Sequence, residues 1–396
     1  MSNQPAKSLS AYNLLLVLSL LGLVYGGVFK AFFVLTGVNV YDLTILSAIS
    51  IVLLLMMKFE FKFKRDGVWV AILLGSFSFS YMSSLLYSPS SVYGPQKLVG
   101  FLGLLFSFFV GLMLPKGVVS LFLRVIPDFG IVISIAFLLI MTSNLQALIE
   151  FDFSGVGLVA GEILGVGVII CIFQPDKSIL RMLGMLLSIS LILFLGARGP
   201  LFFLILIGSF LGLMSVGRNL NYLAIIRRKT LYFIIIAISS SFILISILSG
   251  TPIFEFMESG FSRFLLFFES DKGDSVNLRM QMISDAIYYI GQSPFLGHGL
   301  GSYGLVVYGT DFRAYPHNGV LEIWFEAGIA GLVLFLSFIL MSFMMAMKRN
   351  HATLACIIIF LILNFLKSSS LDELRLLFLI CGFSAGFLVN EKGYKN

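Results

Sequence analysis

Charged residues are scarce in this sequence. Only 12% of its 396 residues are charged, whereas 59% are hydrophobic. A water-soluble domain usually has about 25% charged and about 45–50% apolar residues. The shortage argues against a water-soluble globular protein and predicts a polytopic membrane protein. Because basic residues mostly report topology in such proteins, the formal charge of +6 does not indicate nucleic-acid binding.

Cysteine and histidine are also scarce, with three of each. Cys171, Cys356 and Cys381 fall in apolar segments, and their spacing indicates neither a disulfide framework nor a metal site. The histidines likewise lack the i, i+4 spacing of a metal-binding helix. We therefore expect no metal and no cofactor.

Long apolar runs fill most of the chain. Because a membrane-spanning helix needs roughly 20 mostly apolar residues, the sequence predicts an all-α fold with about twelve spans. The expected spans lie near residues 12–29, 38–57, 68–86, 97–114, 119–142, 155–173, 179–196, 200–216, 231–249, 318–347, 352–366 and 374–390.

These spans divide the chain into three parts. Residues 1–249 are expected to form an N-terminal bundle of about nine spans, and residues 317–396 a C-terminal group of about three. Residues 250–316 form one large loop with helix-like apolar patterning, which predicts short helices in an ordered cap.

The basic residues predict orientation, since cytoplasmic loops are enriched in lysine and arginine. With the N-terminus inside, they recur in every second loop, so both termini are expected in the cytoplasm and residues 250–316 outside. The cytoplasmic set is Lys58, Lys62, Lys64, Arg65, Lys116, Lys177, Arg181, Arg218, Arg227, Arg228, Lys229, Lys348, Arg349, Lys392 and Lys395.

Two arginines are candidate anion-binding residues, because a guanidinium offers phosphate a planar fork of donors. Arg198 lies at a predicted tight outward turn next to Gly199 and Pro200. Its alternative is a snorkelling arginine at the membrane interface.

Arg279 lies in a predicted helix that begins near Asp274 or Ser275. Its alternative is an ion pair with Glu269 or Asp271. At about 100° per residue it shares an apolar face, which comprises Ile283, Ala286, Ile287 and Ile290.

His317 is the candidate general base. It follows Pro316, which suits the first turn of a helix. The partial positive charge at a helix N-terminus favours a neutral imidazole, and a neutral imidazole can remove a proton from a hydroxyl. The alternative is an interfacial histidine that makes a cap-like hydrogen bond.

Glu322 and Glu326 share one face of the helix after His317. For both we favour an interhelical pair with a cation, or a role in holding the histidine or arginines, over direct catalysis. Lys97, also predicted at the outer face, would add positive charge to the same cavity. Residues 372, 373 and 375 together with Lys367 are interpreted as a solvated rim.

Residues 299–304 match the pattern G-x-G-x-x-G. A dinucleotide site needs this pattern between a strand and a helix, whereas here it lies in a loop between spans. We interpret the glycines as residues that let the chain turn tightly.

Three elements together resemble the O-antigen polymerase and ligase superfamily. They are Ala197-Arg-Gly199; Arg279 followed by Ser293-Pro-Phe-Leu-Gly-His-Gly-Leu-Gly-Ser-Tyr303; and residues 316–331, Pro-His-Asn-Gly-Val-Leu-Glu-Ile-Trp-Phe-Glu-Ala-Gly-Ile-Ala-Gly. Ala197 departs from the family's usual serine, and residues 155–165 contain no Asn-Pro-Asn-like segment.

The resemblance implies a GT-C-like glycosyltransferase of the bacterial inner membrane that uses neither nucleotide sugar nor metal. Arg198 and Arg279 would hold the pyrophosphate of an undecaprenyl-pyrophosphate-linked oligosaccharide, and His317 would activate the acceptor hydroxyl. Lys97, Glu322, Glu326 and Tyr303 complete the expected substrate site. Membrane lipids and a chain-length regulator are further candidate partners.

Polymerase is the first choice, because the chain departs from the ligase pattern. O-antigen ligase is the alternative, with lipid A–core as acceptor. A lipid-linked glycan flippase would be expected to show repeated halves and charges inside the spans; here the candidate charges gather toward one face.

Overall fold

The computed structural model describes residues 11–35, 43–57, 65–143, 153–173, 179–195, 197–216, 239, 274–349, 351–367 and 369–386. All regular secondary structure in these residues is helical. The longer helices are α1 (Ala11–Leu35), α2 (Leu43–Met57), α3 (Arg65–Ser83), α4 (Tyr93–Met113), α5 (Lys116–Ser143), α7 (Phe153–Phe173), α8 (Ile179–Phe194), α9 (Arg198–Val216), α12 (Asp274–Gln292), α14 (Gly319–Lys348), α15 (Ala352–Lys367) and α16 (Arg375–Gly386). The short ones are η1 (Ser84–Tyr87), α13 (Tyr303–Tyr308) and η2 (Leu371–Glu373).

The all-α prediction is confirmed for the described residues. Every expected span except 231–249 overlaps a helix, and that span lies outside the described residues apart from residue 239. Five of the described helices are long and apolar enough to cross a membrane. Many large apolar side chains, such as Phe79 and Met57, are exposed on the surface. Such a surface suits lipid, because exposed apolar patches of this extent are rare on soluble monomers.

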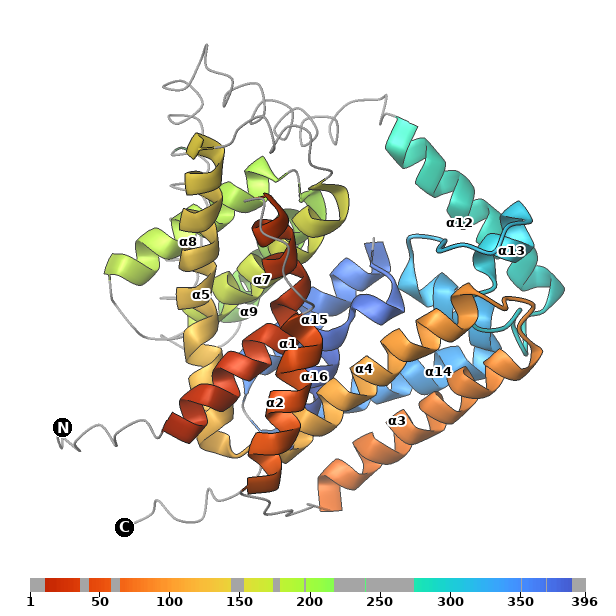
Figure 1. Cartoon of the computed structure of the whole chain (residues 1–396), viewed down its shortest axis with the longest axis horizontal. Helices are drawn as coiled ribbons and strands as arrows, with labels where there is room; N and C mark the ends of the chain where they lie inside the picture. The colour runs from red at the N-terminus through yellow and green to blue at the C-terminus, as the bar shows by residue number, and fades with distance from the viewer. Residues whose placement is uncertain are drawn as a thin grey trace.

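Two groups of helices form the core. On one side α14 packs against α3, and α16 packs against α4 and α14 (Figure 1). On the other side α7 packs against α5, α8 and α9, and α15 joins the two groups by contacting α7, α9, α14 and α16. Small residues allow the closest approach, since a Cβ on Gly111 or Gly382 would collide with the backbone of the facing helix.

Segments expected on the same side of the membrane lie together. The turn between α3 and α4 contacts the later loop, because the Ser88 hydroxyl donates to the carbonyl of Leu300 at 2.7 Å. At the other end of α14, Arg349 directly follows the helix, and its guanidinium donates to the carbonyl of Ser384 in α16. This sorting agrees with the expected alternation, while the side that faces the cytoplasm stays a prediction.

Candidate functional site

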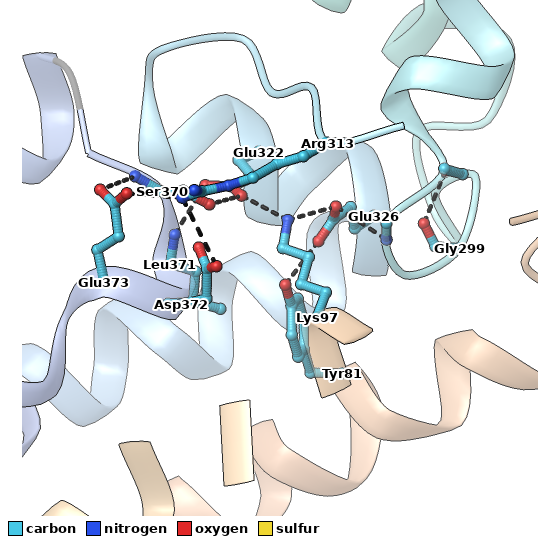
Figure 2. Close-up of polar contacts among 12 residues, drawn as sticks. Tyr81, Lys97, Gly299, Arg313, Glu322, Glu326, Ser370, Leu371, Asp372 and Glu373 are labelled. Carbon is cyan, nitrogen blue, oxygen red and sulfur yellow. Dashed lines mark hydrogen bonds and ion pairs between the residues drawn. The ribbon is translucent and has the colours of Figure 1, made fainter. Parts of the chain in front are cut away.

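A buried cation lies between two carboxylates where α4 meets α14. The Lys97 ammonium is 2.5 Å from Glu322 Oε1 and 2.6 Å from Glu326 Oε1, and Lys97 is only 2% exposed (Figure 2). A buried charge is costly unless it is paired and hydrogen-bonded. The geometry therefore fits the interpretation of the two glutamates as an interhelical pair with a cation.

Other donors complete the hydrogen bonding of Glu326. The Tyr81 hydroxyl of α3 donates to Oε2 at 2.6 Å, and the Gly301 N–H donates to Oε1 at 3.0 Å. The carboxylate thus ties α3, α4, α14 and the loop around residue 301 to one another.

Glu322 joins the same cluster to the chain before α16. The Ser370 hydroxyl donates to Oε1 at 2.5 Å and the Leu371 N–H donates to Oε2 at 3.0 Å. The positive charge of Lys97 is therefore paired with the two glutamates inside the protein. Through these contacts the cluster joins α14 to α3, α4, the loop at Gly301 and the chain at Ser370 and Leu371.

Helix α14 is broken at Gly328, whose φ of 66° is left-handed. The loop before α13 fills the break, since the N–H groups of His298 and Gly299 donate to the carbonyls of Phe325 and Glu326 at 2.7 and 3.0 Å. Irregular backbone inside a membrane protein is tolerated where protein satisfies its polar groups, and this loop does so.

The glycines of the G-x-G-x-x-G pattern turn the chain tightly, as predicted. Gly299 and Gly301 have φ values of 94° and 70°, which favour glycine. A Cβ on Gly301 would also lie 2.7 Å from the Cα of Gly94, so the turn packs directly on α4.

His317 lies just outside α14 and has a left-handed φ of 52°. The helix begins at Gly319, and the Asn318 side chain caps it by accepting two N–H groups of the first turn at 3.1 Å. The expectation that Pro316 forms the first turn is therefore wrong, because the asparagine cap sets the helix start three residues later.

Arg313 is a site residue that sequence reasoning missed. Its Nη2 lies 2.6 Å from Glu373 Oε1 and 3.8 Å from Asp372 Oδ2. Burial alone would lower the pKa of Arg313, but the two carboxylates outweigh it and raise that pKa. The interpretation of Asp372 as part of a solvated rim is wrong, since its side chain is only 20% exposed and faces this arginine.

Tyr315 lies between Arg313 and His317 in the sequence, and its ring lies against the histidine. Its ring centroid lies 4.4 Å from that of His317. Burial, and then the charges of Glu373 and Glu322, raise the pKa of the Tyr315 hydroxyl, so it stays protonated at physiological pH.

Asp311 fixes the same loop to the start of α4. Its carboxylate accepts from the Ser90 hydroxyl at 2.7 Å and from the N–H groups of Val92 and Tyr93 at 2.8 and 3.2 Å. Burial alone would raise the pKa of Asp311, but these hydrogen bonds outweigh it and lower that pKa.

Arg198 is the first residue of α9, and α8 ends at Phe194, so the predicted tight turn is confirmed. Its side chain lies outside the described residues. The helix start lies beside the end of α15, because a Cβ on Gly199 would lie 3.4 Å from Lys367 Nζ. A helix N-terminus and a lysine both favour an anion there.

Arg279 lies in α12, so the predicted helix is confirmed for the described residues, and its side chain is partly exposed. Its suggested partners Glu269 and Asp271 lie outside the described residues. Tyr303 anchors this helix, because its hydroxyl donates to the carbonyl of Met282 at 2.8 Å.

The predicted apolar face of α12 is only partly correct. Ala286 and Ile290 are buried, but Ile287 is 57% exposed. On this face residues 286 and 290 are therefore buried, residues 279 and 283 are partly exposed, and residue 287 is exposed.

The structure thus brings some of the predicted site residues together and leaves others apart. Lys97, Glu322 and Glu326 form one cluster, and His317 lies against the ring of Tyr315, two residues after Arg313 in the sequence. No contact between described residues links Arg279 to His317. The missed partners of the cluster, Tyr81 and Ser370, come from segments far away in the sequence. Arg313 and Tyr315 were also missed, although both lie within four residues of His317.

Comparison with known proteins agrees with the sequence resemblance. Residues 183–336 match the family model Wzy_C, described as O-antigen ligase, which confirms the predicted resemblance to the O-antigen polymerase and ligase superfamily. No curated protein matches the chain. The described residues contain no group of three or more His, Cys, Asp or Glu that could hold a metal ion.

Proposed function

We propose that this protein is a glycosyltransferase that joins undecaprenyl-pyrophosphate-linked repeat units at the outer face of the bacterial inner membrane. The observation that carries the proposal is the match of residues 183–336 to the O-antigen ligase model. That region contains all three residues for which a catalytic role was predicted: Arg198, Arg279 and His317.

In the proposed reaction, His317 accepts the proton of the acceptor hydroxyl. The hydroxyl oxygen forms a bond to the anomeric carbon of the donor sugar, and the bond from that carbon to the pyrophosphate oxygen breaks. The electron pair leaves with undecaprenyl pyrophosphate, whose charge Arg198 and Arg279 offset. Because pyrophosphate is a good leaving group, the proposal requires neither metal nor nucleotide.

The proposed topology follows the basic residues. It has about twelve spans with both termini in the cytoplasm, and residues 250–316 form the outer loop. Lys97, Glu322 and Glu326 act in this topology as the scaffold beneath the site. The sorting of helix ends and the five apolar helices among the described residues support it.

O-antigen ligase is the second candidate, and the family match is compatible with either enzyme. The acceptor would then be lipid A–core. We retain polymerase as first choice because Ala197 and residues 155–165 depart from the ligase pattern. The family match gives no support to the flippase alternative.

Deleting the gene from its host should separate these functions. If the protein is the polymerase, surface glycan analysed by gel electrophoresis should shorten to one repeat unit per acceptor, because a separate ligase still works. A ligase mutant would instead accumulate full-length lipid-linked chains with none on lipid A–core. Single units trapped on the cytoplasmic leaflet would contradict both enzymatic assignments.

Arg198→Ala and Arg279→Ala should each reduce chain extension on the order of 10- to 150-fold, since each loses a charge-assisted contact to phosphate. Lysine should restore activity poorly because it lacks the planar fork. The measurement is the rate of extension by purified protein at equal amounts of inserted enzyme. Full activity of Arg279→Ala would instead favour the ion-pair interpretation.

A further inference from the structure

Tyr93, the first residue of α4, buries a hydroxyl group that has no hydrogen-bond partner among the described residues. The residue is only 4% exposed. A buried polar atom without a partner is uncommon in a native protein and requires an explanation. One explanation is a ligand that completes its hydrogen bonding.

A second such atom lies on the same side of α4. Oδ1 of Asp372 is buried and also lacks a hydrogen-bond partner among the described residues. Tyr93, Lys97 and Gly100 are spaced i, i+4 and i+7, so they share one helix face. A Cβ on Gly100 would lie 3.0 Å from the Cβ of Asp372, which brings this carboxylate to that face.

Two residues of the loop before α14 complete the group. Arg313, whose side chain is 51% exposed, faces Asp372, and the Tyr315 ring lies against His317. Asp311, two residues before Arg313, accepts from the N–H of Tyr93 at 3.2 Å, which places the start of α4 beside this loop. The hydroxyl of Tyr93, the free oxygen of Asp372 and the ring beside His317 thus belong to one region.

The charge of this region identifies the kind of ligand. Asp372 and Glu373 place two carboxylates against the single guanidinium of Arg313, and the Lys97 ammonium near the Tyr93 ring is already paired with Glu322 and Glu326. A pyrophosphate would therefore be repelled. A neutral sugar fits, because each of its hydroxyls both donates and accepts hydrogen bonds. Asp372 Oδ1 can accept such a bond, and the Tyr93 hydroxyl can donate or accept one.

We propose that Tyr93, Asp372, Arg313 and Tyr315 form a subsite for the acceptor saccharide, distinct from the arginines that hold the donor pyrophosphate. This inference rests on the proposed function, because it assigns the acceptor end of that reaction. The subsite holds the sugar beside His317, where its hydroxyl loses its proton.

Binding to purified full-length protein tests the subsite without requiring turnover. The probes are the host's repeat-unit oligosaccharide released from its lipid, core oligosaccharide, and undecaprenyl pyrophosphate. Tyr93→Phe should weaken binding of the saccharide roughly 3- to 10-fold, because one hydrogen bond is lost, and Asp372→Ala should weaken it at least as much. Affinity for undecaprenyl pyrophosphate should stay within about twofold.

Tyr25→Phe is the matched control, since Tyr25 in α1 has the other buried tyrosine hydroxyl without a partner among the described residues. It should leave saccharide binding unchanged. Tyr93→Phe should not lower the melting temperature, because it removes a polar group that no described residue satisfies. A drop in melting temperature with weaker binding of all probes would indicate a structural role and overturn the proposal.

Wild-type affinity for both saccharides in Tyr93→Phe and Asp372→Ala, or no saccharide binding by the wild type, would also overturn the subsite. Preference for core oligosaccharide would keep the subsite and identify a ligase. Saccharide binding without any binding of undecaprenyl pyrophosphate would keep the subsite and contradict the proposed function.

Discussion

His317→Ala should lower the rate of glycan transfer by roughly 10²–10⁴-fold while donor binding persists, because general base catalysis is typically worth that much. The residue is held two positions before α14 by a left-handed backbone and the ring of Tyr315. Substitution removes the proton acceptor but leaves the Asn318 cap that starts the helix. The measurement is single-turnover transfer by purified protein saturated with lipid-linked donor.

His351→Ala provides the matched control. His351 lies between α14 and α15, at the end of α14 opposite to His317. Its removal should leave the rate near that of the wild type. A wild-type rate in His317→Ala would remove the histidine from the chemistry, and equal losses in both variants would indicate a general loss of structure.

Lys97→Met should strongly destabilise the folded protein. It leaves Glu322 and Glu326 buried without their cation, and breaking a buried ion pair from one side costs roughly 3–5 kcal/mol. Unfolding of detergent-solubilised protein should therefore shift to a much lower temperature. Adding Glu322→Gln and Glu326→Gln should recover part of the loss, because no buried charge then remains unpaired.

A surface pair offers the comparison for that experiment. Asp128 accepts from Arg181 at 3.1 Å, and its side chain is 50% exposed. Asp128→Asn should cost at most about 1 kcal/mol, as is usual for exposed ion pairs. If Lys97→Met were no more destabilising than Asp128→Asn but abolished donor binding, Lys97 would be a substrate residue, as expected from the sequence.

The helices were predictable because burial in lipid leaves a local mark in the sequence. Apolar runs delimit the spans, and the break between the end of α8 at Phe194 and the start of α9 was visible in the sequence as a short turn at Arg198. The shared face of Glu322 and Glu326 followed from helix geometry alone. Each of these inferences depends on residues within one or two turns of one another.

The polar contacts between helices were not predictable in this way. Tyr81 donates a hydrogen bond to Glu326, 245 positions away in the sequence, and Ser370 donates one to Glu322, 48 positions away. Hydropathy indicates that a carboxylate in a span needs a partner, but it does not identify the partner. The break of α14 at Gly328 was missed for the same reason, because a distant loop satisfies the carbonyls before it.

The most direct test of the proposed activity is the length of glycan that purified wild-type protein makes from lipid-linked repeat units, without nucleotide sugar or any second protein. The proposed mechanism predicts a ladder of longer lipid-linked chains with release of undecaprenyl pyrophosphate, and no ladder with His317→Ala. Repeat units that remain single in the presence of folded wild-type protein would contradict it.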